Sequence, residues 1–368
     1  MKRCIFYLPY KLDEKGNGAR MLRPRKMIQA FRDIGYDVLV IEGFSWERRK
    51  QIREVKRMIK NGIKYDFLYT ESHTEPTLLT NPNHLPTHPF LDFGFFSFVK
   101  KYGIKIGLFY CDIYWKFDNY GKDLPTWKRQ SALWNYRYDI KQYKKLLSKL
   151  YLPDMKVCFY LNEPKLEEIA DELPPAADNI EIKQKEYLDR DFAQDPLTIF
   201  YVGGLGNQYQ ITELVKAVGN TEKSRLVLCC RDAEWKKEKQ TISPFLNDRI
   251  EIIHKSSDEL EPFYQQADLC SLLFKNDLYI EFAKPFKAYE YLAHELPALA
   301  TDGTAIGEFV KENDIGWAIP YESDEVEKIL KSIIDNSSLL MEKKVNCTKT
   351  KGQNLWINRA CRVAEDLS

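Results

Sequence analysis

Apolar runs of strand length recur along this chain, and amphipathic helical patterns separate them. The first series begins with CIFYLP at 4–9, continues as an amphipathic helix over 24–34 and returns as the strand YDVLVI at 36–41. Strand, helix and strand form one βαβ unit, so the N-terminal half is expected to be a parallel α/β layer. Further apolar runs that extend its predicted sheet lie at 66–70, 104–110 and 155–161.

A second series of the same kind begins in mid-chain, after an acidic, proline-containing stretch that we interpret as a linker near 175–195. YVGGL at 201–205 ends an apolar strand in a glycine turn, and a helical pattern resumes at 211–218. A strand, a glycine turn and a helix form a cradle for phosphate. The remaining predicted elements are strands at 225–230, 250–253, 268–274 and 297–301 and helices at 258–266, 285–294 and 304–312.

We therefore predict an α/β protein with two Rossmann-like domains that face each other across a cleft. The predicted N-terminal domain covers 1–185, the C-terminal domain covers 186–345, and a helix in 346–368 packs back on the N-terminal domain. Open α/β sheets bind ligands outside the carboxyl ends of their strands, so the ligand is expected in that cleft.

Composition narrows the class of protein. The 368 residues are 44% hydrophobic and 30% charged, and the net charge of +1 argues against a general nucleic-acid binder. No apolar run approaches the roughly 20 residues that span a bilayer, and the N-terminus shows no signal peptide. The eight cysteines show neither a CxxC pair nor zinc-like spacing. We expect buried thiols in a reducing cytosol and no metal site.

One stretch is strongly basic and aromatic. Residues 126–149 hold seven Lys or Arg beside Trp127, Trp134 and three tyrosines. This composition is typical of a helix that lies on anionic lipid, which predicts peripheral contact with a membrane. The alternative is an ordinary solvated helix face.

Two carboxylates stand at positions suited to chemistry. Lys287 and Glu290 share one face of the predicted 285–294 helix, where the cation suits a diphosphate and the carboxylate suits a ribose. Asp112 follows a predicted strand, where it can take a proton or stabilise an oxocarbenium-like centre. The alternatives are a solvated Lys–Glu pair and an aspartate that caps a turn.

PFKAYEYLA at 285–293, followed by ELPALATDGTAIGEFV and by GWAIP at 316–320, resembles the donor-site signature of GT-B glycosyltransferases, family 4 most closely. YVGGL resembles the first strand and turn of their C-terminal domain, and GYDVLVI resembles a strand of their N-terminal domain. The resemblance implies a donor domain in the C-terminal half and an acceptor domain in the N-terminal half.

Carried onto this chain, the resemblance implies that Glu290 binds the ribose, that Lys287 serves the donor phosphates and the reaction, and that Asp112 is catalytic. The implied donor-binding residues are Gly16, Gly18, Gly204, Arg231, His254, Lys284, Lys287, Glu290 and Thr304. Arg20 and Arg23 are the expected acceptor-binding residues. A structural histidine is the alternative interpretation of His254, and a solvated surface residue is that of Arg231.

This chain departs from the family pattern at three positions. Gly204 and Tyr209 stand where family members usually carry an arginine and a lysine, and Phe282 stands where they carry a glutamate. Neutralisation of the phosphates is therefore assigned to Arg231 and Lys284 together with Lys287.

The resulting hypothesis is a cytoplasmic glycosyltransferase that makes peripheral contact with the inner face of a membrane. It would move a sugar from a nucleotide-diphosphate sugar to a saccharide or lipid-linked hydroxyl, with retention, in surface-polysaccharide assembly. No metal and no cofactor besides the donor are expected. The alternative is a catalytically silent GT-B paralogue that acts as a nucleotide-binding or scaffold subunit. A nicotinamide dehydrogenase fits less well, because 203–208 does not read GxGxxG.

Overall fold

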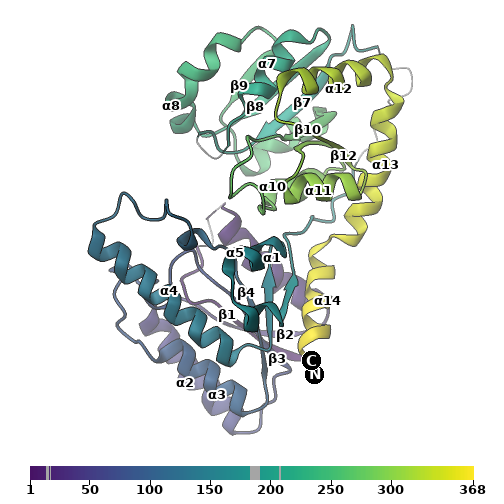
Figure 1. Cartoon of the computed structure of the whole chain (residues 1–368). Coiled ribbons are helices and arrows are strands. Elements are labelled where there is room, and N and C mark those ends of the chain that lie inside the picture. Colours follow the sequence, from purple (N-terminus) through teal and green to yellow (C-terminus); the bar gives the residue numbers. More distant parts are fainter. Residues whose placement is uncertain (14–15, 17, 183–190, 207–208) are drawn as a thin grey trace. The chain divides into compact units, whose positions relative to one another are not determined.

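The computed structural model describes residues 1–13, 16, 18–182, 191–206 and 209–368. The chain forms two units, whose elements are labelled in Figure 1. Unit 1 comprises Met1–Pro174 and Trp356–Ser368, and unit 2 comprises Pro175–Leu355. The predicted boundary between residues 185 and 186 lies outside the described residues.

Unit 1 is built on one parallel sheet. Its described strands are β1 (Arg3–Tyr7), β2 (Asp37–Ile41), β3 (Phe67–Glu71), β4 (Lys105–Phe109), β5 (Lys149–Leu152) and β6 (Ala170–Glu172). They pair in the order β2-β1-β3-β4-β5-β6, and each pairing is parallel. Because helices cover both faces, the inner strands are mainly apolar on both faces rather than alternating. Every residue of β3 is buried, including Thr70 and Glu71 at its end.

Helices cover this sheet in two layers. They are α1 (Ala19–Asp33), α2 (Ser45–Lys60), α3 (Leu91–Lys101), α4 (Thr126–Leu146), α5 (Lys156–Leu161), α6 (Pro164–Glu167) and α14 (Trp356–Leu367). α1 packs on α14, whereas α3 packs between α2 and α4 (Figure 1). Right-handed crossovers place α1 and α2 on opposite faces, because β2 and β3 lie on opposite sides of β1.

The prediction of a strand over 155–161 is wrong. This stretch forms α5, because the Asp154 carboxylate accepts a hydrogen bond from the Lys156 N–H (2.8 Å) and its carbonyl accepts one from the Val157 N–H (3.1 Å). Such an aspartate turn starts a helix. Asn162 ends the helix in the left-handed conformation, with φ of 50°. The strand that pairs with β4 is instead β5, which lies before α5 in the chain and follows the basic helix α4.

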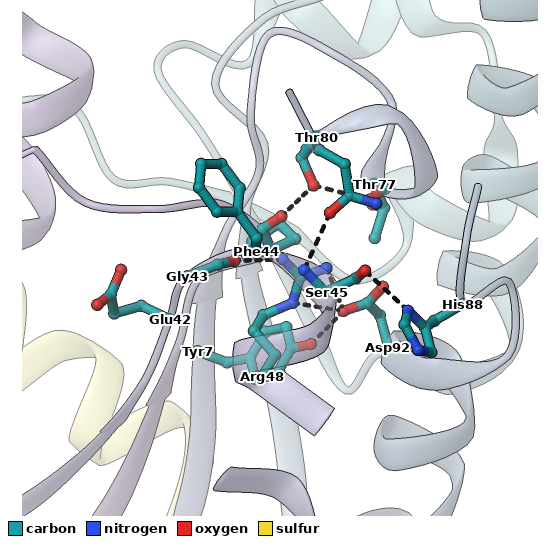
Figure 2. A network of polar contacts seen from close by, with 12 residues as sticks. Tyr7, Glu42, Gly43, Phe44, Ser45, Arg48, Thr77, Thr80, His88 and Asp92 are labelled. Atoms are coloured by element: carbon teal, nitrogen blue, oxygen red, sulfur yellow. Dashed lines mark hydrogen bonds and ion pairs between the residues drawn. The ribbon is translucent and has the colours of Figure 1, made fainter. Parts of the chain in front are cut away.

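A fully buried ion pair ties α2 and α3 to β1 (Figure 2). Arg48 directs its Nε (3.0 Å) and a terminal nitrogen (2.9 Å) at Asp92 Oδ1, and the Tyr7 hydroxyl donates to the same oxygen. The other terminal nitrogen of Arg48 donates to the Gly43 carbonyl at 2.5 Å. Each side chain is at most 2% exposed, so these charges are tolerated only because they satisfy one another.

Unit 2 is built on a second parallel sheet. Its described strands are β7 (Leu197–Val202), β8 (Ser224–Cys229), β9 (Ile250–Ile253), β10 (Leu269–Leu272), β11 (Ala298–Thr301) and β12 (Gly316–Ile319). They pair in parallel in the order β12-β11-β10-β7-β8-β9. The apolar runs at 197–202 and 268–274 therefore form the buried centre of this sheet.

The helices of unit 2 are α7 (Thr212–Asn220), α8 (Asp232–Ile242), α9 (Glu261–Gln266), α10 (Phe286–Ala293), α11 (Ala305–Glu312), α12 (Ser323–Asp335) and α13 (Ser338–Gln353). α7 packs on α8 and α12, and α13 packs on α10 and α12. The predicted start of the returning segment, residue 346, lies inside α13. Residues up to Leu355 stay with unit 2, and α14 belongs to unit 1.

The prediction of an α/β fold with two Rossmann-like domains is confirmed. All eight cysteines are free thiols, and six of them are buried. Among the described residues, none of the helices combines the length and the apolar character needed to cross a membrane.

Candidate functional site

The topological switch point of unit 2 lies between β7 and β10. The chain enters the sheet at β7, adds β8 and β9 on one side and then crosses back to add β10 on the other. Open α/β sheets bind ligands outside the carboxyl ends of the strands at such a point. The pairing of β7 with β10 ends at Phe200 and Cys270. Beyond that point, the Tyr291 hydroxyl accepts a hydrogen bond from the Val202 N–H at 3.0 Å. This bond ties α10 to the carboxyl end of β7.

The glycine turn after β7 has little space around it. The Tyr201 hydroxyl donates to the Gly204 carbonyl at 2.6 Å. A Cβ on Gly204 would lie 3.3 Å from the Tyr209 ring and 3.7 Å from Glu234 Oε2. Glycine at this position therefore keeps the backbone accessible between two larger side chains, as close approach to a phosphate requires. Tyr209, the uncharged departure from the family pattern, packs on Phe274 at 5.2 Å.

Arg231 lies two residues beyond the end of β8, and its side chain is 81% exposed. Its guanidinium lies 2.7 Å from Glu234 Oε1, and the other Glu234 oxygen accepts the Leu205 N–H at 3.2 Å. Sequence reasoning missed Glu234, although its place three residues after Arg231 at the start of a helix was a signal. A phosphate would therefore have to compete with Glu234 for this cation.

His254 follows β9 at the same edge of the sheet. Its Nδ1 lies 2.8 Å from the Cys230 carbonyl, which makes Nδ1 the proton-bearing nitrogen. Nε2 faces Asp232 Oδ1 at 3.7 Å. The His254 ring is thus held in place, as expected for a structural histidine, and its side chain remains partly exposed. Among the described residues, no three His, Cys, Asp or Glu side chains are arranged to hold a metal ion.

α10 carries the predicted Lys–Glu pair. Its N-cap is Pro285, and its buried face comprises Ala288, Tyr289, Tyr291, Leu292 and Ala293. On the opposite face Lys287 Nζ contacts Glu290 Oε2, and the two side chains are 32% and 25% exposed. The Tyr264 hydroxyl, from α9, also reaches Glu290 Oε2, at 3.2 Å. Sequence reasoning missed Tyr264, because nothing in the local pattern links it to α10.

Two further predicted donor-binding residues, Thr304 and Lys284, are partly or fully buried. Thr304 is fully buried and forms the N-cap of α11. Its hydroxyl accepts the Gly307 N–H at 3.0 Å and donates to the Thr301 carbonyl at 2.6 Å, so the side chain has no surface to offer a donor. Lys284 is half-buried and directly precedes Pro285, the N-cap of α10.

In unit 1 the predicted glycine loop lies in part outside the described residues, since 14, 15 and 17 are not described. Gly18 is the N-cap of α1, and a Cβ there would meet no atom within 4 Å. A Cβ on Gly16 would lie 2.9 Å from the Met21 side chain. Arg20 is exposed, and its guanidinium donates to the Thr74 hydroxyl at 2.7 Å.

Arg23 is a correction to the predicted acceptor-binding set. It is 5% exposed, and its guanidinium lies 3.3 Å from Glu71, 3.0 Å from the Leu173 carbonyl and 3.6 Å from the centre of the Phe109 ring. The partner carboxylate is at the end of β3, where burial raises the pKa of Glu71. Arg23 is therefore a buried cation that ties α1 to β3 and to the segment after β6, rather than an exposed anion-binding residue.

Asp112 lies three residues beyond β4, at the carboxyl edge of the unit 1 sheet. Its Oδ1 accepts the Tyr114 N–H at 2.9 Å, so it does cap a turn, as the alternative interpretation held. Burial nevertheless raises the pKa of Asp112 to about 6. A carboxylate near neutral pKa at the end of a parallel strand has the properties of a general base.

His73, two residues beyond β3, was missed at the sequence level, although its place after a predicted strand was a signal. Its Nδ1 accepts the Glu75 N–H at 3.1 Å, and burial together with Arg20 lowers the pKa of His73 to about 4. The ring is therefore neutral, with its proton on Nε2. It lies beside the Tyr10 ring (4.8 Å) at the switch point between β1 and β3.

Two parallel six-stranded sheets among the described residues, each with a switch point, define the class of fold: it is the GT-B fold of glycosyltransferases. Residues 183–352 match the family model described as glycosyl transferases group 1. The matched residues cover most of unit 2.

Solved structures of the same fold span the whole chain. HepE from Anabaena in complex with UDP has a TM-score of 0.66 at 13% identity, and the alignment covers 100% of this chain and 99% of HepE. Sucrose-phosphate synthase from Thermosynechococcus elongatus has a TM-score of 0.64 at 12% identity, with 99% and 98% covered. A glycosyltransferase from Rickettsia africae has a TM-score of 0.63 at 13% identity, with 100% and 98% covered. A search of curated proteins finds no significant match.

Proposed function

We propose that this chain transfers a sugar from a nucleotide-diphosphate sugar to a hydroxyl of a saccharide or lipid-linked acceptor. The observation that carries this proposal is the Lys287–Glu290 pair on α10, which Tyr291 ties to the switch-point end of β7. A carboxylate there can accept both hydroxyls of a ribose, and a cation at a helix N-terminus suits a diphosphate. HepE has been solved with UDP and with UDP-glucose, so UDP-sugars are the first donors to test.

On the donor side, Glu290 would bind the ribose and Lys287 the phosphates, with Lys284 and Arg231 adding positive charge. Gly204 would let the backbone approach the pyrophosphate, and His254 would lie against the base. These cations and the α10 N-terminus would neutralise the leaving diphosphate without a metal ion. Arg231 would contribute only after it releases Glu234.

On the acceptor side, Asp112 would take the proton of the acceptor hydroxyl or stabilise the oxocarbenium-like centre. Arg20 would bind an anionic acceptor, and the backbone at Gly16 and Gly18 would approach the reacting groups. The resemblance to family 4 supports retention and a role in surface-polysaccharide assembly on the cytoplasmic side of a membrane. Proton NMR of the first-formed product tests retention, and an inverted anomer would refute it.

Glu290→Ala should weaken binding of the preferred nucleoside diphosphate roughly 10–100-fold, because a charge-assisted hydrogen bond is worth about 1.5–3 kcal/mol. The experiment screens UDP-, GDP-, ADP- and TDP-sugars for turnover and then measures binding of the matching diphosphate by calorimetry. Glu222→Ala, an exposed glutamate of unit 2, is the control and should leave affinity unchanged. Equal affinity of wild type and Glu290→Ala would refute the donor site.

A catalytically silent nucleotide-binding subunit is the second candidate. The uncharged Gly204 and Tyr209 and the pairing of Arg231 with Glu234 favour it, because each reduces positive charge near the phosphates. Binding that depends on Glu290 without turnover of any donor would select this candidate over the enzyme.

We further propose that α4 lies on an anionic membrane surface. Its buried residues form one face of the helix, and Trp127 (67% exposed) and Trp134 (62% exposed), seven residues apart, lie on the other. The exposed face continues through four cations, Arg137, Lys141, Lys144 and Lys145. Exposed tryptophans that adjoin a row of cations suit the headgroup region of a bilayer that contains acidic lipid.

Trp127→Ser/Trp134→Ser should reduce binding to phosphatidylglycerol-containing vesicles by about tenfold per tryptophan, since apolar burial of each ring contributes about 1.5 kcal/mol or more. Binding should also weaken as salt screens the cations. Trp46→Ser removes an exposed tryptophan of α2 (45% exposed) and is the matched control. Co-sedimentation that is identical for the double variant and wild type would refute the membrane surface.

A further inference from the structure

Tyr264 makes a hydrogen bond that orients the Glu290 carboxylate. Tyr264 is 6% exposed, and its hydroxyl lies 3.2 Å from Glu290 Oε2. Burial, together with the nearby Glu290 charge, holds the pKa of Tyr264 well above its ordinary value. The phenol therefore keeps its proton and donates it to the carboxylate.

The packing of unit 2 fixes where this hydroxyl lies. The Tyr264 ring is stacked on His294, with centroids 3.9 Å apart and planes 15° apart, and meets Phe200 edge-on at 5.1 Å. His294 is itself held, because Nδ1 lies 2.8 Å from the Glu290 carbonyl and Nε2 lies 3.0 Å from Glu261 Oε2. The position of the hydroxyl is therefore set by α9, α10 and β7 and does not depend on a bound nucleotide.

The two donors that reach Glu290 share one oxygen. Lys287 Nζ and the Tyr264 hydroxyl both contact Oε2, and no described residue makes a hydrogen bond to Oε1. A carboxylate has about four lone-pair positions, two on each oxygen. Oε2 is thus occupied by protein donors, and Oε1 keeps two positions, which is the number that two neighbouring hydroxyl groups need.

We propose that Tyr264 is a positioning residue that gives the donor site its preference for ribonucleotides over deoxyribonucleotides. This inference rests on the proposed function, because it takes Glu290 to be the ribose ligand. By holding Oε2, Tyr264 turns Oε1 toward the 2′- and 3′-hydroxyls. Without that bond only Lys287 holds Oε2, so the carboxylate is less firmly oriented. A ribose then meets a less preorganised acceptor, and the two nucleotide types become harder to distinguish.

Tyr264→Phe tests this inference, because it removes the hydroxyl and keeps the stacked ring. Calorimetry gives the dissociation constants for UDP, 2′-deoxy-UDP and 3′-deoxy-UDP, or for the corresponding set of another base if wild type prefers it. Wild type should favour the ribonucleotide by about tenfold or more. In the variant, the ratio of deoxynucleotide to ribonucleotide dissociation constants should fall by at least about threefold. Its affinity for the deoxynucleotides should change less than about twofold. A general loss of packing would weaken all three ligands equally and would overturn the inference.

A double-mutant cycle separates this inference from the proposed function. In the Glu290→Gln background, Tyr264→Phe should have no further effect on the ribose preference. Tyr143→Phe, which removes a buried hydroxyl from unit 1, is the control and should leave all the affinities unchanged. If wild type binds no nucleoside diphosphate, the proposed function fails. If a ribose preference depends on Glu290 and is unchanged in Tyr264→Phe, only the role of Tyr264 fails.

Discussion

Arg48→Met is expected to lower the free energy of unfolding of unit 1 by about 3–5 kcal/mol, the cost of leaving a buried charge without its partner. Of its partners among the described residues, Asp92 would keep only the Tyr7 hydroxyl, and its side chain is 2% exposed (Figure 2). Methionine fills a similar volume, so the loss of unfolding free energy would come mainly from the missing charge and not from a cavity. In a unit of this size each kcal/mol lowers Tm by roughly 2–4 °C, and differential scanning calorimetry should show the shift.

Arg49→Met is the matched control, because Arg49 is the next residue of α2 and is exposed. It should change stability by no more than about 0.5 kcal/mol. Arg48→Met/Asp92→Leu, which removes both charges, should recover much of the stability that the single variant loses. A single variant as stable as wild type would show that the network does not hold α2 and α3 against β1.

The fold was largely predictable because its signals are local. Each inner strand is an apolar run buried on both faces, and α10 was placed within one residue at each end by Pro285 and its apolar spacing. The error at 155–161 has a local cause as well. An apolar run of seven residues suits either a strand or a short helix. The Asp154 side chain, whose hydrogen bond starts the helix, lies just outside that run. β5, only four residues long, follows α4 with no intervening turn signal.

The site was less predictable because its partners are distant in the sequence. Arg20 and Arg23 are equivalent in local pattern, but Arg23 meets Glu71 and the Phe109 ring from two strands and becomes buried. In the same way, Glu290 and Lys287 were found from their spacing on one helix, whereas Tyr264 reaches Glu290 only through the packing of α9 on the sheet. Spacing identifies pairs on one element, and tertiary packing decides which charges stay accessible.

Asp112→Asn is expected to lower kcat by about 10²–10⁴-fold, the usual contribution of a positioned general base. The amide keeps an oxygen that can accept the Tyr114 N–H, so the turn that Asp112 caps should survive. In wild type, kcat/KM should rise with pH through about 6, where Asp112 loses its proton, and then level off. Asp154→Asn is the matched control, since Asp154 accepts an equivalent N–H bond from Lys156 and should leave turnover unchanged.

Stability measured on the same variant separates catalysis from structure. The folded-state pKa of Asp112 is raised from 3.8 to about 6, so the folded protein holds a proton that the unfolded chain releases between these values. The Asp112 contribution to stability therefore falls as pH rises from about 4 to about 6, and the asparagine variant should lack this fall. At pH 7.5 the variant should be at least as stable as wild type and yet nearly inactive. Full turnover in Asp112→Asn, with loss only in Asp112→Ala, would show instead that this carboxylate does no more than cap its turn.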